Sequence, residues 1–173
     1  MKRFSMRPAP PTDAIRVPVS EIDIPQIDQI ELMFFAYRDF TADPDRILES
    51  LKMGRAHHRA LYFINRRPGM TVAELISILS ITKQSLARVL RELLDAGYIC
   101  QITGDQDRRQ RHLYPTQSGR KLILELSAPQ SRRIAAALLE GGISDPEVIA
   151  RFMKAMIGPS KGSGNLEAKY GAG

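Results

Sequence analysis

Apolar side chains recur along most of the chain at the spacing of amphipathic helices. The pattern predicts a first helix over residues 26–40. Asp43 followed by Pro44 is typical of a helix start, because aspartate caps free N–H groups and proline fits the first turn. A second helix is therefore expected to begin there. A third is expected from Arg55 to Asn65, with these residues facing inward: Ala56, Ala60, Leu61, Phe63 and Ile64.

Two shorter helices follow, each with a strong start signal. Thr71 with Glu74 three residues later forms the capping-box pattern, and Thr82 can cap the next helix. A tight turn at Ser80-Ile81 separates the two helices, and Gly97 stands where a left-handed residue ends the second. Two short helices joined in this way are typical of a helix-turn-helix. The second helix is predicted to bury Leu86, Val89, Leu90, Leu93 and Leu94.

Residues that favour strands replace the helical pattern after Gly97. The segments Tyr98–Ile102 and Arg111–Tyr114 predict two strands joined by polar turn residues. A hairpin, or wing, is therefore expected directly after the helix-turn-helix. Because Pro115 cannot donate to a strand ladder, the returning strand is expected to end one residue before it.

Two further helices and the two termini complete the chain. Thr116 is expected to cap a long helix that bends at Pro129, and a last helix is expected over 146–157. Residues 1–25 contain five prolines and predict an extended arm, whereas the Gly/Ser-rich residues 158–173 predict a flexible tail. The expected fold is mainly α with a small β-hairpin wing.

Composition fits one folded domain, since the 173 residues are 43% hydrophobic and 25% charged. No apolar run approaches the roughly 20 residues that span a bilayer, and no apolar stretch follows the basic N-terminus as in a secretory signal. A cytoplasmic location without a membrane partner is therefore expected. Cys100 is the single cysteine, which excludes an intrachain disulfide and a Cys-rich zinc site.

Positive charge is concentrated in the centre of the chain. The whole chain carries a net charge of +6, whereas residues 54–121 hold 12 basic and 5 acidic residues, a net charge of +7. A surface that binds nucleic acid needs such a concentration, because released counterions supply most of the non-specific affinity. The same residues can also form an ordinary solvated surface, so charge alone leaves both alternatives open.

The predicted helix-turn-helix and wing resemble the DNA-binding core of the MarR family of bacterial regulators. The stretch DQDRRQRHLYPTQSGR is similar to the family's wing signature, Asp-x-Arg-x-Arg followed by Leu-x-x-Thr-x-x-Gly-Arg. The stretch GRAHHRALYFINRRPGMTVAEL is similar to the PetP-like branch in particular. The signature positions here are Asp107, Arg109, Arg111, Leu113, Thr116, Gly119 and Arg120.

The resemblance implies a transcriptional regulator that binds double-stranded DNA as a homodimer and uses no cofactor. It implies a MarR-like domain over 26–157, in which helices over 26–53 and 116–157 pair two copies and 54–115 form the winged helix-turn-helix. Two-fold pairing sets the recognition helices about one DNA turn apart, so a near-palindromic operator is expected. The family also implies a cleft for a small aromatic or anionic effector.

The second helix of the motif is the candidate recognition helix, whose first residues would reach base edges in the major groove. Gln84 suits adenine, and Arg88 suits guanine or phosphate. Arg91 either contacts DNA or pairs with Asp95 four residues on, whereas Thr82 and Ser85 either bind phosphate or cap the helix. The candidate DNA-binding residues of this helix are Thr82, Lys83, Gln84, Ser85, Arg88 and Arg91.

The wing supplies four more candidates, Asp107, Arg108, Arg109 and Arg111. An arginine at a hairpin tip can enter the narrow minor groove, where the negative potential is enhanced, and Arg108 or Arg109 is best placed to do so. In MarR-like proteins an aspartate orients such an arginine, which matches Asp107 with Arg109 or Arg111. The alternative is a solvated basic turn.

The histidines and the cysteine have plainer alternatives. His57 and His58 are adjacent on a helix and point about 100° apart, which does not favour a shared metal ion, so no metal is expected. His58 and Tyr62, four residues apart, are candidates for lining the effector cleft, with ordinary helix packing as the alternative. Cys100 falls on the first wing strand, where burial is expected and oxidant sensing is the alternative.

Two other classes of protein compete with a DNA-binding regulator. A winged-helix module that binds protein would present an uncharged recognition face, which Lys83, Arg88 and Arg91 argue against. An enzyme would need converging nucleophile, acid and base residues. No catalytic triad, phosphate loop or paired-carboxylate site stands out in the sequence, so an enzyme is not expected.

Overall fold

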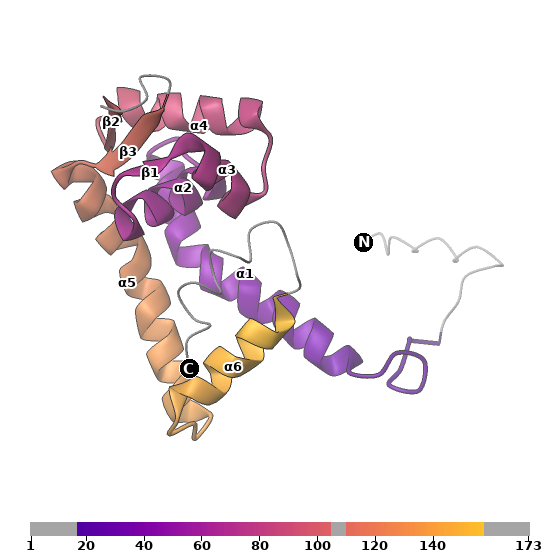
Figure 1. The fold of residues 1–173 in the computed structure, drawn as a ribbon. Helices are drawn as coiled ribbons and strands as arrows, with labels where there is room; N and C mark the ends of the chain where they lie inside the picture. The colour runs from indigo at the N-terminus through magenta and orange to yellow at the C-terminus, as the bar shows by residue number, and fades with distance from the viewer. Residues whose placement is uncertain (1–16, 105–109, 158–173) are drawn as a thin grey trace, which may run out of the picture. The chain divides into compact units, whose positions relative to one another are not determined.

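The computed structural model describes residues 17–104 and 110–157. Helices account for most of these residues and three short strands form one small sheet (Figure 1), so the predicted fold class is confirmed. None of the described helices is long and apolar enough to cross a membrane. In chain order the elements are α1 (Ile27–Ser50), α2 (Arg55–Arg66), β1 (Met70–Thr71), α3 (Val72–Leu79), α4 (Lys83–Asp95), β2 (Ile99–Thr103), β3 (Arg111–Pro115), α5 (Gln117–Glu140) and α6 (Pro146–Met156).

The chain divides into two units, residues 1–38 and 39–173. The described part of the first unit is a turn followed by the first half of α1. In the turn, the carbonyl of Ser20 accepts hydrogen bonds from the N–H groups of Asp23 and Ile24 (3.0 and 2.9 Å). The backbone and hydroxyl of Ser20 donate in return to the Asp23 carboxylate, which holds the pKa of that carboxyl below its ordinary value. The chain therefore folds back on itself just before α1 begins.

The second unit encloses one apolar core, to which the end of α1, α2, α3, α4, the sheet and the start of α5 contribute. On α2 the inward stripe runs through positions 57, 60, 61 and 64, as helical spacing requires. His57 therefore takes the inward place in the first turn, and Ala56 is exposed, so the prediction for Ala56 was wrong. On α4 the predicted inward positions are buried or partly buried: Leu86, Val89, Leu90, Leu93 and Leu94.

Helix α1 passes through Asp43 and Pro44 without a break, so the helix start predicted there is wrong. Proline has no N–H, and the carbonyl of Phe40, four residues earlier, consequently loses its helical donor. The side-chain amide of Gln130 on α5 donates to that carbonyl from Nε2 (3.3 Å). A residue 90 positions away thus supplies the missing hydrogen bond. Helix α5 likewise continues through Pro129.

The sheet has the order β1-β3-β2, and both pairings are antiparallel. Strands β2 and β3 form the predicted hairpin, but β3 includes Pro115, opposite Ile99, instead of ending one residue earlier. Proline is tolerated there because the last residue of a strand need not donate to the ladder. Strand β1 was not predicted; it pairs Met70 with Leu113 and Thr71 with His112.

Helix α5 begins in close contact with Gly97 and Tyr98, the two residues just before β2. Thr116 caps the helix as predicted, since its Oγ1 accepts from the N–H of Gly119 (3.1 Å). The hydroxyl of Thr116 donates to the carbonyl of Gly97 (2.6 Å), and its backbone N–H donates to the carbonyl of Tyr98 (3.1 Å). A β carbon on Gly119 would lie 1.9 Å from that Tyr98 oxygen. Only glycine allows this approach.

Several large apolar side chains remain exposed on α1, α5 and α6. On α1, the side chains of Leu32, Phe34 and Tyr37 are 64, 71 and 57% exposed. Helix α6 buries none of its residues, and Phe152 is 54% exposed. A helix of a monomeric protein normally turns such residues toward a core. These faces are therefore of the kind that another protein surface covers.

Candidate nucleic-acid interface

Local hydrogen bonds fix both helices of the helix-turn-helix. Thr71 Oγ1 accepts from the N–H of Glu74 (3.2 Å), and Glu74 Oε2 accepts from the N–H of Thr71 (2.6 Å), which confirms the capping box. The hydrogen bonds from Thr71 hold the pKa of the Glu74 carboxyl below its ordinary value. Ser80 adopts a left-handed φ of 51° in the turn, and Thr82 Oγ1 accepts from the N–H of Ser85 (3.1 Å) to start α4.

The turn between α3 and α4 is also tied to α2. Arg59 on α2 donates from Nη2 to the carbonyl of Leu79, the last residue of α3 (3.3 Å). A cation at this position donates to a carbonyl that has no partner within the helix, and it interacts favourably with the negative end of the helix dipole. On the other side of the turn, Leu86 and Leu93 anchor α4 in the core with no exposed surface. The hydrogen bond from Arg59 and the burial of Leu86 and Leu93 together fix the position of α4.

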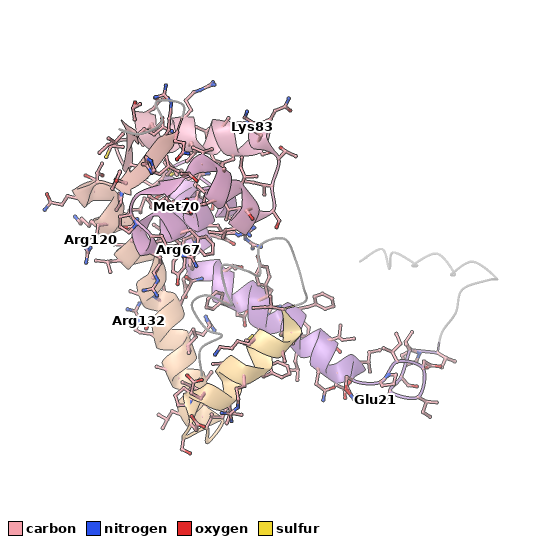
Figure 2. The ribbon with its side chains drawn as sticks, in the orientation of Figure 1. Glu21, Arg67, Met70, Lys83, Arg120 and Arg132 are labelled. Carbon is pink, nitrogen blue, oxygen red and sulfur yellow. The ribbon has the colours of Figure 1, made fainter. Side chains whose placement is uncertain are left out.

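The outer face of α4 is open to solvent, and Figure 2 marks Lys83 at its start. Thr82 caps the helix, and its hydroxyl donates to Ser85 Oγ (2.9 Å). Phosphate binding by either residue stays a prediction. Every position predicted to face solvent is exposed, namely Lys83, Gln84, Ser85, Ala87, Arg88 and Arg91.

Arg88 is linked through Glu92 to α2. Its Nε donates to Glu92 Oε1 (2.9 Å), and Glu92 Oε2 lies 2.5 Å from Nε2 of His57. Hydrogen bonds from Arg88 and then from His57 hold the pKa of the Glu92 carboxyl below its ordinary value, and Glu92 raises the pKa of Arg88. The sequence analysis did not predict this series of hydrogen-bonded side chains. It weighed a pair between Arg91 and Asp95, but no described carboxylate lies within ion-pair distance of Arg91.

The wing is described up to its tip. Arg111 is exposed at the start of β3, opposite Thr103 of β2, and the N–H of Gly104 donates to the carbonyl of Gln110 (3.0 Å). The hairpin therefore still pairs at residues 104 and 110. The predicted contacts of Asp107, Arg108 and Arg109 lie outside the described residues.

The two residues predicted to bind an effector lie on α2. His58 is half-buried, and burial lowers the pKa of its imidazole, while the nearby charge of Asp45 acts in the opposite direction. Tyr62 is 40% exposed, and its ring meets that of Phe63 edge to face at 5.4 Å between centroids. Neither observation tests binding of an effector.

An open hollow of about 420 Å³ lies against Asp43 of α1 and Arg132 and Arg133 of α5. Arg133 Nη2 is 3.7 Å from the Asp43 carboxylate. Neither His58 nor Tyr62 lines this hollow, so their effector role stays a prediction.

Both ring nitrogens of His57 are engaged in hydrogen bonds, since Nδ1 accepts from the N–H of Gly54 (3.1 Å). Among the residues with described positions, no group of three or more His, Cys, Asp or Glu side chains could hold a metal ion. Cys100 is exposed, contrary to the expected burial. Alternation along β2 explains this, because Ile99 turns into the core and its neighbour must face the other way.

Comparison with known proteins points in one direction. The model of the MarR family matches residues 51–110, which include the helix-turn-helix. The HTH-type transcriptional regulator PetP of Rhodobacter capsulatus is 53% identical to this chain over 134 residues, which are 76% of this chain and 79% of PetP.

Solved structures show the same fold. A crystal structure of MarR matches with a TM-score of 0.57 and 26% identity over 79% of this chain and 90% of MarR. A mutant MarR from E. coli, complexed with operator DNA, matches with a TM-score of 0.57 and 18% identity over 76% of this chain and 95% of that protein.

Proposed function

Since this chain belongs to the MarR family, we propose that it is a transcriptional regulator that binds double-stranded DNA with sequence specificity. One observation carries the proposal. Helix α4 is anchored in the core by its apolar face and exposes Lys83, Arg88 and Arg91 on the opposite face. The name of PetP, a transcriptional regulator, and the operator bound to the E. coli relative agree with it.

In the proposed complex the start of α4 enters the major groove. Gln84 would read adenine, and Arg88 would bind guanine or phosphate. Lys83 and Arg91 would bind the phosphate backbone. We extend the proposal to the wing, where Arg108 or Arg109 would enter the minor groove with support from Asp107. Arg111 would contribute to the same contacts from the start of β3.

We propose that the active form is a homodimer. The exposed apolar residues of α1, α5 and α6 supply surfaces that a second copy can cover, and Phe34 and Leu139 are among the most exposed at 71 and 83%. Two-fold pairing would place two α4 helices about one DNA turn apart and require a near-palindromic operator. The protein would act where the chromosome is, in the cytoplasm, without catalysing a reaction. Release by a small effector near His58 and Tyr62 stays a prediction.

A winged-helix module that binds another protein is the competing function. Such a module would bury an apolar or neutral face of α4, whereas the exposed face here carries three cations and no large apolar side chain. The observation favours a polyanion as the partner.

Selection from a random duplex library tests the proposal. The full-length protein should enrich a near-palindromic sequence, which then serves as the probe for fluorescence anisotropy at 50–200 mM salt. The slope of log affinity against log salt is about −5 for the dimer if Lys83, Arg88 and Arg91 of each protomer all neutralise phosphates, and about −4 if Arg88 binds guanine instead. A flat slope, or a library that yields no enriched sequence, would refute the proposed function.

A further inference from the structure

Three side chains connect the exposed face of α4 to the interior. Arg88 is 83% exposed, Glu92 is 37% exposed and His57 is 11% exposed, so the series runs from solvent toward the core. The two carboxylate oxygens of Glu92 are divided between the neighbours, with Oε1 bonded to Arg88 at 2.9 Å and Oε2 to His57 at 2.5 Å. The carboxylate is therefore held at both of its oxygens.

The imidazole of His57 is itself fixed. Its Nδ1 accepts from the N–H of Gly54 (3.1 Å), so the ring proton of the neutral side chain lies on Nε2 and is donated to Glu92. His57 lies in the first turn of α2, where the core-facing stripe begins. Glu92 is thus attached to a side chain that cannot rotate without losing a backbone hydrogen bond.

The consequence for Arg88 is geometric. Glu92 takes the Nε–H, and among the described residues the two terminal nitrogens of Arg88 have no partner. A planar guanidinium held at Nε points its two terminal N–H groups outward as a fixed fork. This fork matches the O6 and N7 acceptors of guanine, whereas a freely rotating arginine would contact phosphate equally well.

We infer that Glu92, held by His57, is a positioning residue that directs Arg88 to a guanine in the major groove. The inference rests on the proposed function and resolves the choice between guanine and phosphate for Arg88. It also explains why a carboxylate stands on a face that approaches DNA, where it repels phosphates. Removing it should therefore raise non-specific affinity and lower specificity at the same time.

Library selection with the full-length wild-type protein and four variants tests the inference. Arg88→Ala should abolish the preference for guanine at one position of each half-site. Glu92→Ala should lower the same preference roughly 5-fold, and the double variant should differ little from Arg88→Ala alone. Asp95→Ala is the matched control, because it removes an exposed carboxylate from the same helix and should raise non-specific affinity without changing the preference.

Glu92→Gln separates positioning from folding. Its amide oxygen can accept from Arg88, but its NH2 group would face the Nε2–H of His57, so the series is broken at one end only. We expect an intermediate loss of guanine preference. The ¹⁵N shifts of the His57 ring should show the Nε2–H form in the wild-type protein and a changed environment at Nε2 in this variant.

Three outcomes would overturn the inference, and only the last of them would also overturn the proposed function. If the wild-type protein enriches a site and both Glu92 variants keep its full guanine preference, the inference is wrong and the proposed function stands. If Arg88→Ala changes no base preference, the inference is also wrong. If the wild-type protein enriches no site or binds without salt dependence, the proposed function fails and the inference with it.

Discussion

Gly119→Ala places a methyl group against the backbone of Tyr98, just before the wing strand β2. The new carbon would lie 1.9 Å from the carbonyl oxygen and 2.8 Å from the carbonyl carbon of Tyr98, where real contacts stay above 3.0 Å. Both atoms belong to the backbone, and the oxygen also accepts the N–H of Thr116 (3.1 Å). No side chain can rotate to make room, so the start of α5 or the strand must move by about 1 Å.

The size of the effect follows from two opposing contributions. Overpacking a core costs about 1–3 kcal/mol, and a conflict with backbone atoms belongs in the upper half of that range. Alanine gains up to about 1 kcal/mol over glycine in a helix interior and less in a first turn. The free energy of unfolding should therefore fall by about 2 kcal/mol. For a chain of this length, that corresponds to a fall in Tm of about 4–8 °C.

Thermal and urea unfolding followed by circular dichroism measure this loss. All samples need the same protein concentration, because the Tm of the proposed dimer would depend on it. Gly54→Ala is the matched control, since no atom lies within 4 Å of a β carbon built there, and its cost should stay below about 1 kcal/mol. If Gly119→Ala is as stable as the wild-type protein, the start of α5 and the segment at Tyr98 can move apart without cost, and our reasoning about their contact is mistaken.

Three further predictions concern other parts of the chain. Burial holds the pKa of His58 below its ordinary 6.5, so the stability that the neutral side chain contributes is complete above pH 6.5 and is lost as the pH falls toward the folded pKa. When the pH is lowered from 7.5 to 5, the free energy of unfolding should therefore fall less in His58→Gln than in the wild-type protein. Gln130→Ala leaves the Phe40 carbonyl without its donor and should lower the free energy of unfolding, measured by urea denaturation, by about 1–2 kcal/mol; an unchanged value would show that this hydrogen bond adds no stability. Phe34→Glu puts charge on the exposed face of α1 and should shift light-scattering mass from dimer toward monomer at micromolar concentration, whereas an unchanged mass would remove this face from the interface.

Signals confined to a few neighbouring residues could be predicted from the sequence. The caps at Thr71, Thr82 and Thr116 were identified correctly, because each depends on a side chain and an N–H group only three residues away. The exposed positions of α4 followed from helical spacing, so most of the candidate interface was predicted as well. The left-handed conformation of Gly97, with φ of 71°, also matched.

Features that depend on distant partners could not be predicted in this way. The helix start predicted at Pro44 is wrong because the sequence does not show that Gln130 donates a hydrogen bond to the carbonyl that loses its donor to the proline. The pairing of Arg88 with Glu92 has a helical spacing that the sequence does show, but the inward contact with His57, 35 residues earlier, depends on how α2 packs against α4. Strand β1 was missed because two residues carry no alternating pattern.

The short strand β1 has a mechanical consequence for DNA reading. Thr71 pairs with His112 of the central strand and, in the same residue, caps α3. His112 adds a second tie, since its Nδ1 lies 2.8 Å from the carbonyl of Gly69. The central strand β3 of the hairpin and the first helix of the motif are therefore joined through Thr71, and we expect them to reorient as a single rigid element. Adjustment to different operators would then come from the spacing of two such elements rather than from bending within either one.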